Sequence, residues 1–290
     1  MIEQITPLIL TYNEAPNIAR TLEQLRWARD IVVIDSFSDD ETLEIVSRYP
    51  QARVFQRKFD SFASQCNFGL LETGIESEWV LSLDADYVLT PEFIEELASM
   101  NPNGSVDAFR AGFIYCINGR RLRSGVYPPV TMLFRRSKAM FRDDGHAHRV
   151  VVNGSIGELR SQVLHDDRKS LERWFQSQRK YVSLEAKKLI DADSAESTPA
   201  DRVRKKRVVA PLAMLIYCLV VRGGILDGWP GLYYAFQRTF AELMLSLYLI
   251  EHDLNSLSQR KLTPAKRYGA EDRKPKAAAR EDQILPDRSS

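Results

Sequence analysis

Residues 79–86 read Trp79-Val80-Leu81-Ser82-Leu83-Asp84-Ala85-Asp86, an apolar run that ends abruptly in two aspartates one residue apart. The run is short enough for an interior strand, because strands covered on both faces read as continuous hydrophobic stretches. Open α/β sheets bind their ligands outside the carboxyl ends of the strands. The two aspartates therefore stand where such a sheet would hold a ligand.

The chain before this run alternates short apolar segments with helical spacing. Strands are expected at 5–11, 31–34 and 53–55, and helices at about 16–25, 38–48, 62–71 and 90–101. Ser38 and Glu41 have the spacing of a capping box for the second of these helices. Strand-like residues from 108 to 163 and a long helix from 170 to 190 follow. The alternation predicts an α/β fold with a mixed, mainly parallel sheet flanked by helices.

Polar residues also end the first two expected strands, as Thr11-Tyr12-Asn13-Glu14 and Asp35-Ser36-Phe37-Ser38. Each cluster has a plain structural reading, because Asp commonly turns a chain and Ser commonly caps a helix. Three clusters at one sheet edge favour a site instead. Mg²⁺ or Mn²⁺ uses one or two carboxylates together with phosphate oxygens, so Asp84 and Asp86 could join the protein to a nucleotide diphosphate.

Together these segments resemble the family 2 glycosyltransferases, whose GT-A fold carries Thr-Tyr-Asn-Glu, Val-Ile-Asp-Ser-like and Leu-Asp-Ala-Asp segments in this order. Residues 8–14, 33–42 and 81–86 match them. The similarity is greatest to lipopolysaccharide core β-glucosyltransferase-like members, which share a stretch matched here by Phe59, Phe62, Gln65 and Asn67. The resemblance covers at least residues 5–190.

The resemblance implies a nucleotide-diphosphate sugar donor and a role for each matched residue. It places donor-binding roles on Thr11, Tyr12, Glu14, Asp35, Gln65, Asn67 and Asp84, with Asp35 reading the base. It places the metal, Mg²⁺ or Mn²⁺, on Asp86 and Asp84. Cys66 stands where many relatives have Lys or Arg, and Arg57 or Lys58 could compensate.

The catalytic base is the point at which the sequence departs from these relatives. They commonly carry Val-His-Glu after the acceptor region, whereas the matching stretch here has Arg149 in place of the glutamate. Inverting transfer needs a base for the acceptor hydroxyl. Asp144 and His146 are the favoured candidates, with Asp143 and His148 nearby. Alternatively, His146 and His148 are a structural pair, or one of them completes the metal shell together with the aspartates. His165 is expected to be structural or to support the ligands.

Composition restricts the partners and the compartment. Forty basic and thirty-nine acidic residues leave a net charge of +1, so nucleic acid is not an expected partner. The three cysteines show neither a zinc nor a disulfide pattern, which favours a reducing compartment. The N-terminus lacks a secretory signal pattern, so the enzyme is expected to stay in the cytoplasm.

The C-terminal part has a different composition. A basic run at 202–207 leads into 14 apolar residues, 208–221, which fall short of the ~20 that a spanning helix needs. Residues 233–250 form an amphipathic pattern, and basic residues flank both segments. We expect an interfacial or re-entrant helical pair on the inner face of the plasma (inner) membrane. The alternative is packing on the catalytic domain or on a second subunit in a homo-oligomer.

The expected organisation is a GT-A catalytic domain at 1–190, a linker and basic stretch at 191–207, a helical appendage at 208–255 and a disordered tail at 256–290. The expected function is metal-dependent, inverting sugar transfer from a nucleotide-diphosphate sugar to a lipopolysaccharide-core, glycolipid or polyprenyl-linked acceptor. Arg149 leaves a second hypothesis, a nucleotide-sugar-binding or assembly protein with impaired catalysis. An NAD-dependent enzyme is disfavoured, because no Gly-x-Gly-x-x-Gly follows the first strand.

Overall fold

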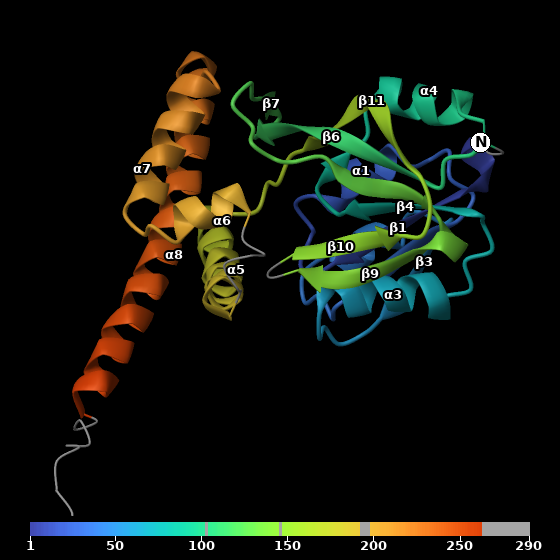
Figure 1. Ribbon diagram of the computed structural model, residues 1–290. Coiled ribbons are helices and arrows are strands. Elements are labelled where there is room, and N and C mark those ends of the chain that lie inside the picture. Colours follow the sequence, from blue (N-terminus) through green and yellow to red (C-terminus); the bar gives the residue numbers. More distant parts are fainter. Residues whose placement is uncertain (102–103, 145–146, 192–197, 263–290) are drawn as a thin grey trace, which may run out of the picture. The chain divides into compact units, whose positions relative to one another are not determined.

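The computed structural model of the chain describes residues 1–101, 104–144, 147–191 and 198–262 (Figure 1). One compact unit comprises Met1–His252 and a second comprises Asp253–Ser290. The boundaries that the sequence suggests at 190, 207 and 255 stay predictions. The helices and strands described below belong to the first unit, except that the last helix runs past its end.

A mixed sheet forms the centre of the first unit. Among the described residues its strands are β1 (Ile5–Thr11), β2 (Ile31–Asp35), β3 (Ala52–Gln56), β4 (Trp79–Asp84), β5 (Tyr87–Val88), β6 (Ala108–Ile117), β7 (Arg120–Arg121), β8 (Val130–Arg135) and β11 (Ile156–His165). Their order is β3-β2-β1-β4-β8-β6-β11-β5, with β7 paired to β6. The first four strands in this order run parallel, and β8 is antiparallel to both of its neighbours. The two remaining strands, β9 (Ala139–Asp144) and β10 (Ala147–Val152), form an antiparallel hairpin.

Helices cover both faces of this sheet, which confirms the expected α/β class (Figure 1). The helices that pack on the sheet are α1 (Ile18–Glu23), α2 (Thr42–Val46), α3 (Phe62–Glu72) and α4 (Pro91–Ser99). Thr90 caps α4 by accepting a hydrogen bond from the Phe93 amide, as its sequence position suggests. The expected capping box of Ser38 and Glu41 is wrong: Glu41 occupies the N-cap of α2, and no side chain caps that helix.

Alternation along each strand divides the core in two. Neighbouring residues such as Leu8 and Ile9 point to opposite faces, because side chains alternate along a strand. Ile9 and its equivalents pack with α1 and α4, whereas Leu8 and its equivalents pack with α3 and with Phe141 of the β9–β10 hairpin. The parallel strands β1, β2 and β4 are therefore buried on both sides, and the carboxyl ends of the parallel strands meet at one edge of the sheet.

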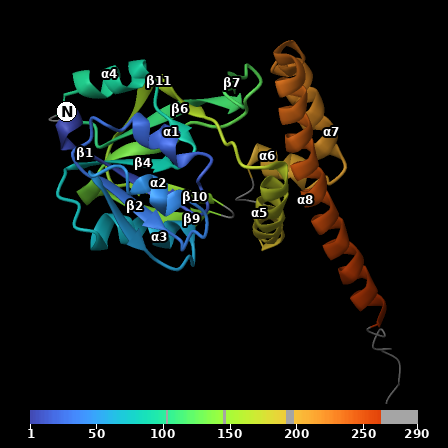
Figure 2. The ribbon, with the colours of Figure 1, turned by 180° about the vertical axis from the view of Figure 1, so that it is seen from behind.

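The C-terminal helices form a second layer beside that edge. They are α5 (Leu171–Asp191), α6 (Pro199–Arg204), α7 (Val209–Ile216) with its π-helical continuation η4 (Tyr217–Val221), the short η5 (Gly224–Asp227), and α8 (Gly228–Leu262). Figure 2 shows α7 and α8 from behind. We call residues Val209–His252, from the start of α7, the C-terminal hairpin.

Two apolar clusters and one group of ion pairs attach the C-terminal hairpin to α5, α6 and β6. Leu245 and Leu249 of α8 pack on α5, and Tyr234 and Cys218 pack on the end of β6. Arg204 of α6 forms ion pairs with Glu242 of α8 at 2.7 Å and with Glu185 of α5 at 3.2 Å. Because all three charges are largely buried, each of these helices is fixed to the others.

Candidate active site

The turn after β4 brings Asp84-Ala85-Asp86 to the carboxyl edge of the sheet. Leu10 of β1 pairs with Asp84 in parallel register, so the turn lies next to the end of β1. The hydroxyl of Thr21 on α1 donates to the carbonyl of Ala85 at 2.7 Å, and both groups are buried. This bond holds the turn against α1 and directs Asp86 inward, where the residue is 9% exposed.

Asp86 faces His165, the last residue of β11. His165 Nε2 lies 3.2 Å from Asp86 Oδ2, and both side chains are nearly buried. Burial would lower the pKa of His165, but the Asp86 carboxylate outweighs it and raises that pKa. Burial would raise the pKa of Asp86, but His165 and Lys169 lower it overall. The geometry and both pKa directions favour an imidazolium–carboxylate pair at neutral pH.

Aromatic rings surround the imidazole of His165. Tyr115 and Tyr127 lie 4.8 and 4.7 Å from it between ring centroids, and Tyr87 lies 5.2 Å away. The hydroxyls of Tyr87 and Tyr127 are 3.1 Å apart and share a hydrogen bond. We call Tyr87, Tyr115 and Tyr127 the aromatic wall. The aromatic wall excludes water from one side of the His165–Asp86 pair and so strengthens the electrostatic attraction between these two side chains.

A second pair of opposite charges lies beside Asp86. Lys169 Nζ is 2.6 Å from Glu14 Oε1 and 3.9 Å from Asp167. Burial raises the pKa of Glu14 to about 7, although Lys169 opposes the shift. Burial also opposes the charge of Lys169, but Glu14, Asp167 and Asp86 together raise its pKa above the ordinary value. A lysine that stays charged therefore stands among the carboxylates of the site.

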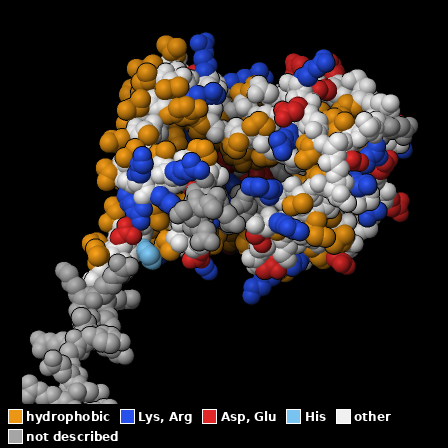
Figure 3. Space-filling model, viewed as in Figure 1, with side chains coloured by type: hydrophobic (Ala, Val, Ile, Leu, Met, Phe, Trp, Pro, Cys, Tyr) orange, Lys and Arg blue, Asp and Glu red, His pale blue; other side chains and the backbone are white. Residues whose placement is uncertain are grey.

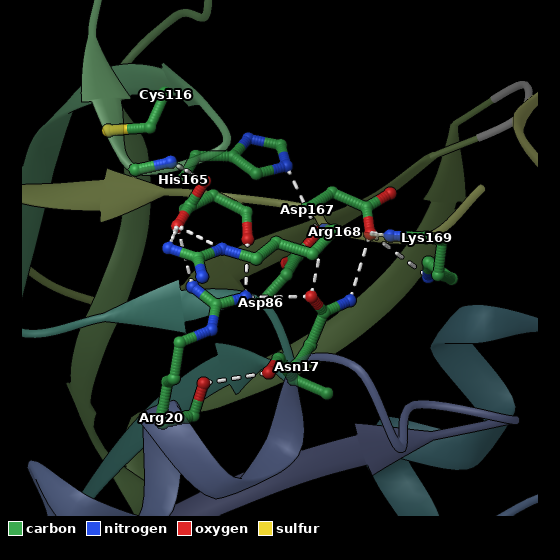
Figure 4. Close-up of polar contacts among 12 residues, drawn as sticks. Asn17, Arg20, Asp86, Cys116, His165, Asp167, Arg168 and Lys169 are labelled. Carbon is green, nitrogen blue, oxygen red and sulfur yellow. Dashed lines mark hydrogen bonds and ion pairs between the residues drawn. The ribbon is translucent and has the colours of Figure 1, made fainter. Parts of the chain in front are cut away.

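The segment from His165 to Lys169 is tied to the start of α1, as Figure 4 shows. Asp166 binds Arg20 at 2.7 Å and Arg168 at 2.9 Å, and it accepts the backbone N–H of Gly119. The Asn17 amide donates to both Glu14 and Asp167 at 2.8 Å. These bonds join the ends of β1 and β11, which are about 150 residues apart in sequence.

Thr11 and Asp35 form a third polar group, at the ends of β1 and β2. Asp35 is fully buried and accepts from the Thr11 hydroxyl at 2.9 Å and from both the amide and the hydroxyl of Ser38. Ser38 thus satisfies a buried carboxylate and does not cap α2, because a buried charge needs donors more than a helix end does. The convergence that the sequence suggested for these three strand ends is present in the structure.

The remaining donor-binding candidates, Tyr12, Gln65 and Asn67, differ in their exposure and in their hydrogen-bond partners. Tyr12 is 46% exposed, and the guanidinium of Arg173 lies 5.0 Å from its ring centroid. Gln65 is buried and donates to Ser36 Oγ and to the carbonyl of Arg57 at 3.0 Å. The amide of Asn67 exchanges two hydrogen bonds with the backbone of Phe141 on β9. Asn67 therefore joins α3 to the β9–β10 hairpin.

Arg57, one of the two candidates for compensating Cys66, binds Asp60 at 2.8 Å and also donates to Gln65. Both favoured candidates for the catalytic base lie outside what the structure describes: His146 falls in the gap at 145–146, and Asp144 is described only as the end of β9. His148 is likewise described only as backbone. Arg149, on β10, is exposed. The assignment of the base accordingly stays a prediction.

The residues present fit a divalent cation. Asp86 Oδ1 is buried and has no hydrogen-bond partner among the described residues, so one carboxylate oxygen is available as a ligand. Within the described ranges, no group of three or more His, Cys, Asp or Glu side chains could hold an ion alone. That arrangement suits Mg²⁺ or Mn²⁺, which complete their shells with phosphate oxygens and water. Asp84 and Asp86 are the carboxylates that would hold it.

Sequence reasoning missed several members of this site. Lys169, Asn17 and Arg20 were not singled out. His165 was expected to be structural or to support the ligands, and it contacts Asp86 directly. The available signal was the run His165-Asp166-Asp167-Arg168-Lys169, five consecutive ionisable residues after an expected strand. The aromatic wall gave no comparable signal, because tyrosines in strands usually serve packing.

The chain is similar in sequence to known glycosyltransferases. The model of the family described as "Glycosyl transferase family 2" matches residues 8–157, which is more than half of the chain. An uncharacterised glycosyltransferase of Rickettsia felis is 26% identical over 204 residues, which cover 65% of this chain and 71% of that protein. The lipopolysaccharide core biosynthesis glycosyltransferase LpsC of Rhizobium meliloti is 23% identical over 202 residues, covering 65% of this chain and 72% of LpsC.

Among solved structures, S. aureus TarS 1–349 in complex with UDP-GlcNAc aligns with a TM-score of 0.46 at 15% identity, covering 87% of this chain and 92% of that one. The family match extends from the Thr11-Tyr12-Asn13-Glu14 segment through Asp84-Ala85-Asp86 to the β9–β10 hairpin. The chain belongs to glycosyl transferase family 2.

Proposed function

We propose that this glycosyltransferase moves a sugar from a nucleotide-diphosphate sugar to a lipopolysaccharide-core, glycolipid or polyprenyl-linked acceptor, with inversion at the anomeric carbon. The observation that carries the proposal is the buried Asp86, whose Oδ1 has no partner within the described residues while Oδ2 is held by His165. The relationship to LpsC, a lipopolysaccharide core biosynthesis enzyme, supports the acceptor class.

The proposed donor site uses the charges gathered at the strand ends. A bound Mg²⁺ or Mn²⁺ would supply a positive charge that stabilises the diphosphate as it leaves. Asp84 and Asp86 would hold that ion, and His165 would keep Asp86 oriented. Lys169 adds a permanent positive charge beside the same position. Thr11, Asp35 and Tyr12 would line the nucleotide side of the site.

The proposed transfer is a single displacement. The acceptor hydroxyl oxygen attacks the anomeric carbon while the bond from that carbon to the diphosphate oxygen breaks. The diphosphate keeps the electron pair, and the hydroxyl proton passes to a base, for which Asp144 and His146 are the candidates. The aromatic wall shields the reacting centre from water and so disfavours hydrolysis of the donor.

A panel of nucleotide sugars, offered with Mn²⁺ or Mg²⁺ and a lipid-linked glycan acceptor, tests the proposal. We expect metal-dependent turnover of one donor by the native chain, its loss on chelation, and its loss in the Asp86→Asn variant. The Glu251→Gln variant, which changes an exposed acid on α8, serves as the matched control. Equal turnover by Asp86→Asn and the native chain would contradict the proposed site.

A second function rests on Arg149, which stands where relatives carry the glutamate expected to act as the catalytic base. In that case the chain would bind nucleotide sugars without transferring them. Binding of a nucleotide sugar with no turnover of any donor, with metal and acceptor present, would favour this alternative. Measured transfer would exclude it.

A further inference from the structure

The C-terminal hairpin has two apolar faces, and the described residues of the chain pack against one of them. Along α8, Tyr234, Leu245 and Leu249 face inward and are at most 4% exposed. A second row faces outward: Trp229 (83% exposed), Tyr233, Phe236, Leu243 and Leu247. Phe240 lies in the same row but packs against Phe175 of α5, with ring centroids 5.4 Å apart. The spacing of the second row places its members on one side of the helix.

The other arm of the hairpin continues this outward face. Leu212, Ile216 and Val220 follow one another at four-residue intervals, and Val220 is 71% exposed. At the turn, Ile225 and Leu226 are 66% and 72% exposed. Figure 3 shows hydrophobic side chains gathered on the side of the molecule that α7 and α8 form. Soluble monomers rarely expose so extended an apolar surface.

We propose that this outward face of the C-terminal hairpin binds an anionic lipid surface and lies in its interface. We call it the lipid face, and define it by Leu212, Ile216, Val220, Ile225, Leu226, Trp229, Phe236, Leu243 and Leu247. The proposal goes beyond sugar transfer, since a surface can bind lipid whether or not the enzyme is active.

Charge distribution favours a lipid surface over a protein partner. Residues 208–221 contain no charged side chain, whereas the six residues before them, 202–207, contain five that are basic. Of these, Arg202 and Lys206 are exposed. Protein interfaces commonly carry a hydrogen bond for every 100–200 Å² or so, which a face built from Leu, Ile, Val, Phe and Trp does not offer. An apolar face next to exposed basic residues is the pattern of helices that lie on anionic membranes.

Two acidic side chains of the C-terminal hairpin are directed away from the lipid face. The Asp227 carboxylate accepts hydrogen bonds from the backbone of Arg123 and Ser124, and Glu242 pairs with Arg204. Arg238 Nε is buried. Asp227 and Glu242 are therefore held against the rest of the molecule, whereas Arg222 and Glu251 are exposed. Pairing the two inward carboxylates lowers the cost of placing the opposite side in an apolar medium.

The dimensions agree with partial insertion. Within the described residues no single helix is long and apolar enough to cross a membrane, whereas Val209–Val221 and Gly224–Ser258 satisfy the length and composition criteria together, with a 65° bend between them. Thirteen helical residues reach about 20 Å, less than the ~30 Å hydrocarbon core. Insertion of this shorter arm into one leaflet fits that length.

Lipid binding would place the active site beside the headgroups. Tyr234 on the inner side of α8 stacks on Tyr115 of the aromatic wall, with ring centroids 4.6 Å apart. A single helix, about 10 Å across, therefore separates the lipid face from the wall around His165. An acceptor whose sugar extends from a lipid would reach the site without leaving the membrane.

Vesicle flotation with the full chain tests the proposal, using phosphatidylglycerol vesicles and phosphatidylcholine vesicles as probes. We expect binding to the anionic vesicles at low salt. The Val220→Glu/Leu226→Glu variant should bind at least tenfold more weakly, and Arg202→Gln/Lys206→Gln should lose about fivefold for each charge removed. A matched control, Leu71→Glu/Met140→Glu, places the same charges at exposed apolar sites on α3 and β9 and should bind like the native chain.

Trp229 gives a readout that needs no charged substitution. Brominated phosphatidylglycerol should quench its fluorescence, and the Trp229→Phe variant should lose most of that quenching while keeping the native circular dichroism spectrum. Native-like vesicle binding by Val220→Glu/Leu226→Glu would overturn the proposal. So would a chain that ignores vesicles and is a dimer which these two substitutions dissociate, because a second copy would then cover the face. Neither result depends on sugar transfer, so the proposed function is tested separately.

Discussion

Replacing Asp227 by alanine would remove one attachment of the C-terminal hairpin to the loop that carries Tyr127. One oxygen of Asp227 accepts three hydrogen bonds, from the amides of Arg123 and Ser124 at 3.0 and 3.1 Å and from the Ser124 hydroxyl at 2.9 Å. The same loop contributes Tyr127 to the aromatic wall. Asp227→Ala therefore tests whether the hairpin supports the active site.

The expected cost follows from the burial of the donors. Arg123 is exposed, so its amide can bind water and should contribute little. Ser124 is fully buried, and its amide and hydroxyl would both lose their acceptor. A buried donor left unsatisfied costs roughly 1–3 kcal/mol, so the two together should cost about 2–4 kcal/mol of the free energy of unfolding. Asp227→Asn keeps one acceptor oxygen and should cost about 1–2 kcal/mol, because only the charge is lost.

Urea denaturation and amide hydrogen exchange provide the assay. We expect Asp227→Ala to lower the free energy of unfolding and to speed exchange at the Ser124 amide, with a smaller effect in Asp227→Asn. Glu251→Ala, which removes an exposed acid from the same helix, should leave both measurements unchanged. If Asp227→Ala unfolds at the native urea concentration and Ser124 exchanges at the native rate, the reasoning about this attachment is wrong.

Three further predictions concern the site and the hairpin. Because burial raises the pKa of Glu14 from 4.5 to about 7, the unfolded chain ionises first as pH rises, so this group's contribution to stability is present below pH 4.5 and is lost by pH 7. Between pH 4.5 and pH 7 the free energy of unfolding should therefore fall by about 3 kcal/mol less in Glu14→Gln than in the native chain. Urea denaturation at several pH values in metal-free buffer measures this difference. Lys169→Met should weaken nucleoside diphosphate binding at least tenfold in calorimetry, whereas Lys180→Met, a change of a lysine on the exposed side of α5, should not. Gly231→Ala should lower the free energy of unfolding by about 1–3 kcal/mol, since its Cβ would stand 2.0 Å from the carbonyl oxygen of Gly224; native stability would contradict this.

The polar residues at the ends of the strands could be predicted from the sequence, because they depend on the local order of apolar and polar residues. The apolar run before Asp84 fixes both the strand and the position of the carboxylates that follow it. The polar residues after β1 and β2 converge for the same reason, since parallel strands end at one edge. Thr11 and Asp35 thus lie together although 24 residues separate them.

Partners supplied by distant segments could not be predicted in this way. His165 and Lys169 reach Asp86 and Glu14 only because β11 and the segment after it return to the end of β1, and no periodicity encodes that return. The role of Ser38 was misassigned for a related reason: its position fits a cap, but the buried carboxylate of Asp35 takes its hydroxyl. Similarly, the pattern of α8 gives an amphipathic helix but does not tell which of its two apolar rows is covered.

Binding of Mn²⁺ in the presence of nucleoside diphosphates tests the central claim most directly, which is that Asp84 and Asp86 hold a metal–diphosphate group. Loss of the electron paramagnetic resonance signal of free Mn²⁺ reports binding during titration with UDP, GDP or ADP. We predict that one of these nucleotides tightens Mn²⁺ binding by the native chain at least tenfold, and that Asp86→Asn abolishes this effect. Equal Mn²⁺ binding by Asp86→Asn and the native chain, or binding that no nucleotide changes, would contradict the account.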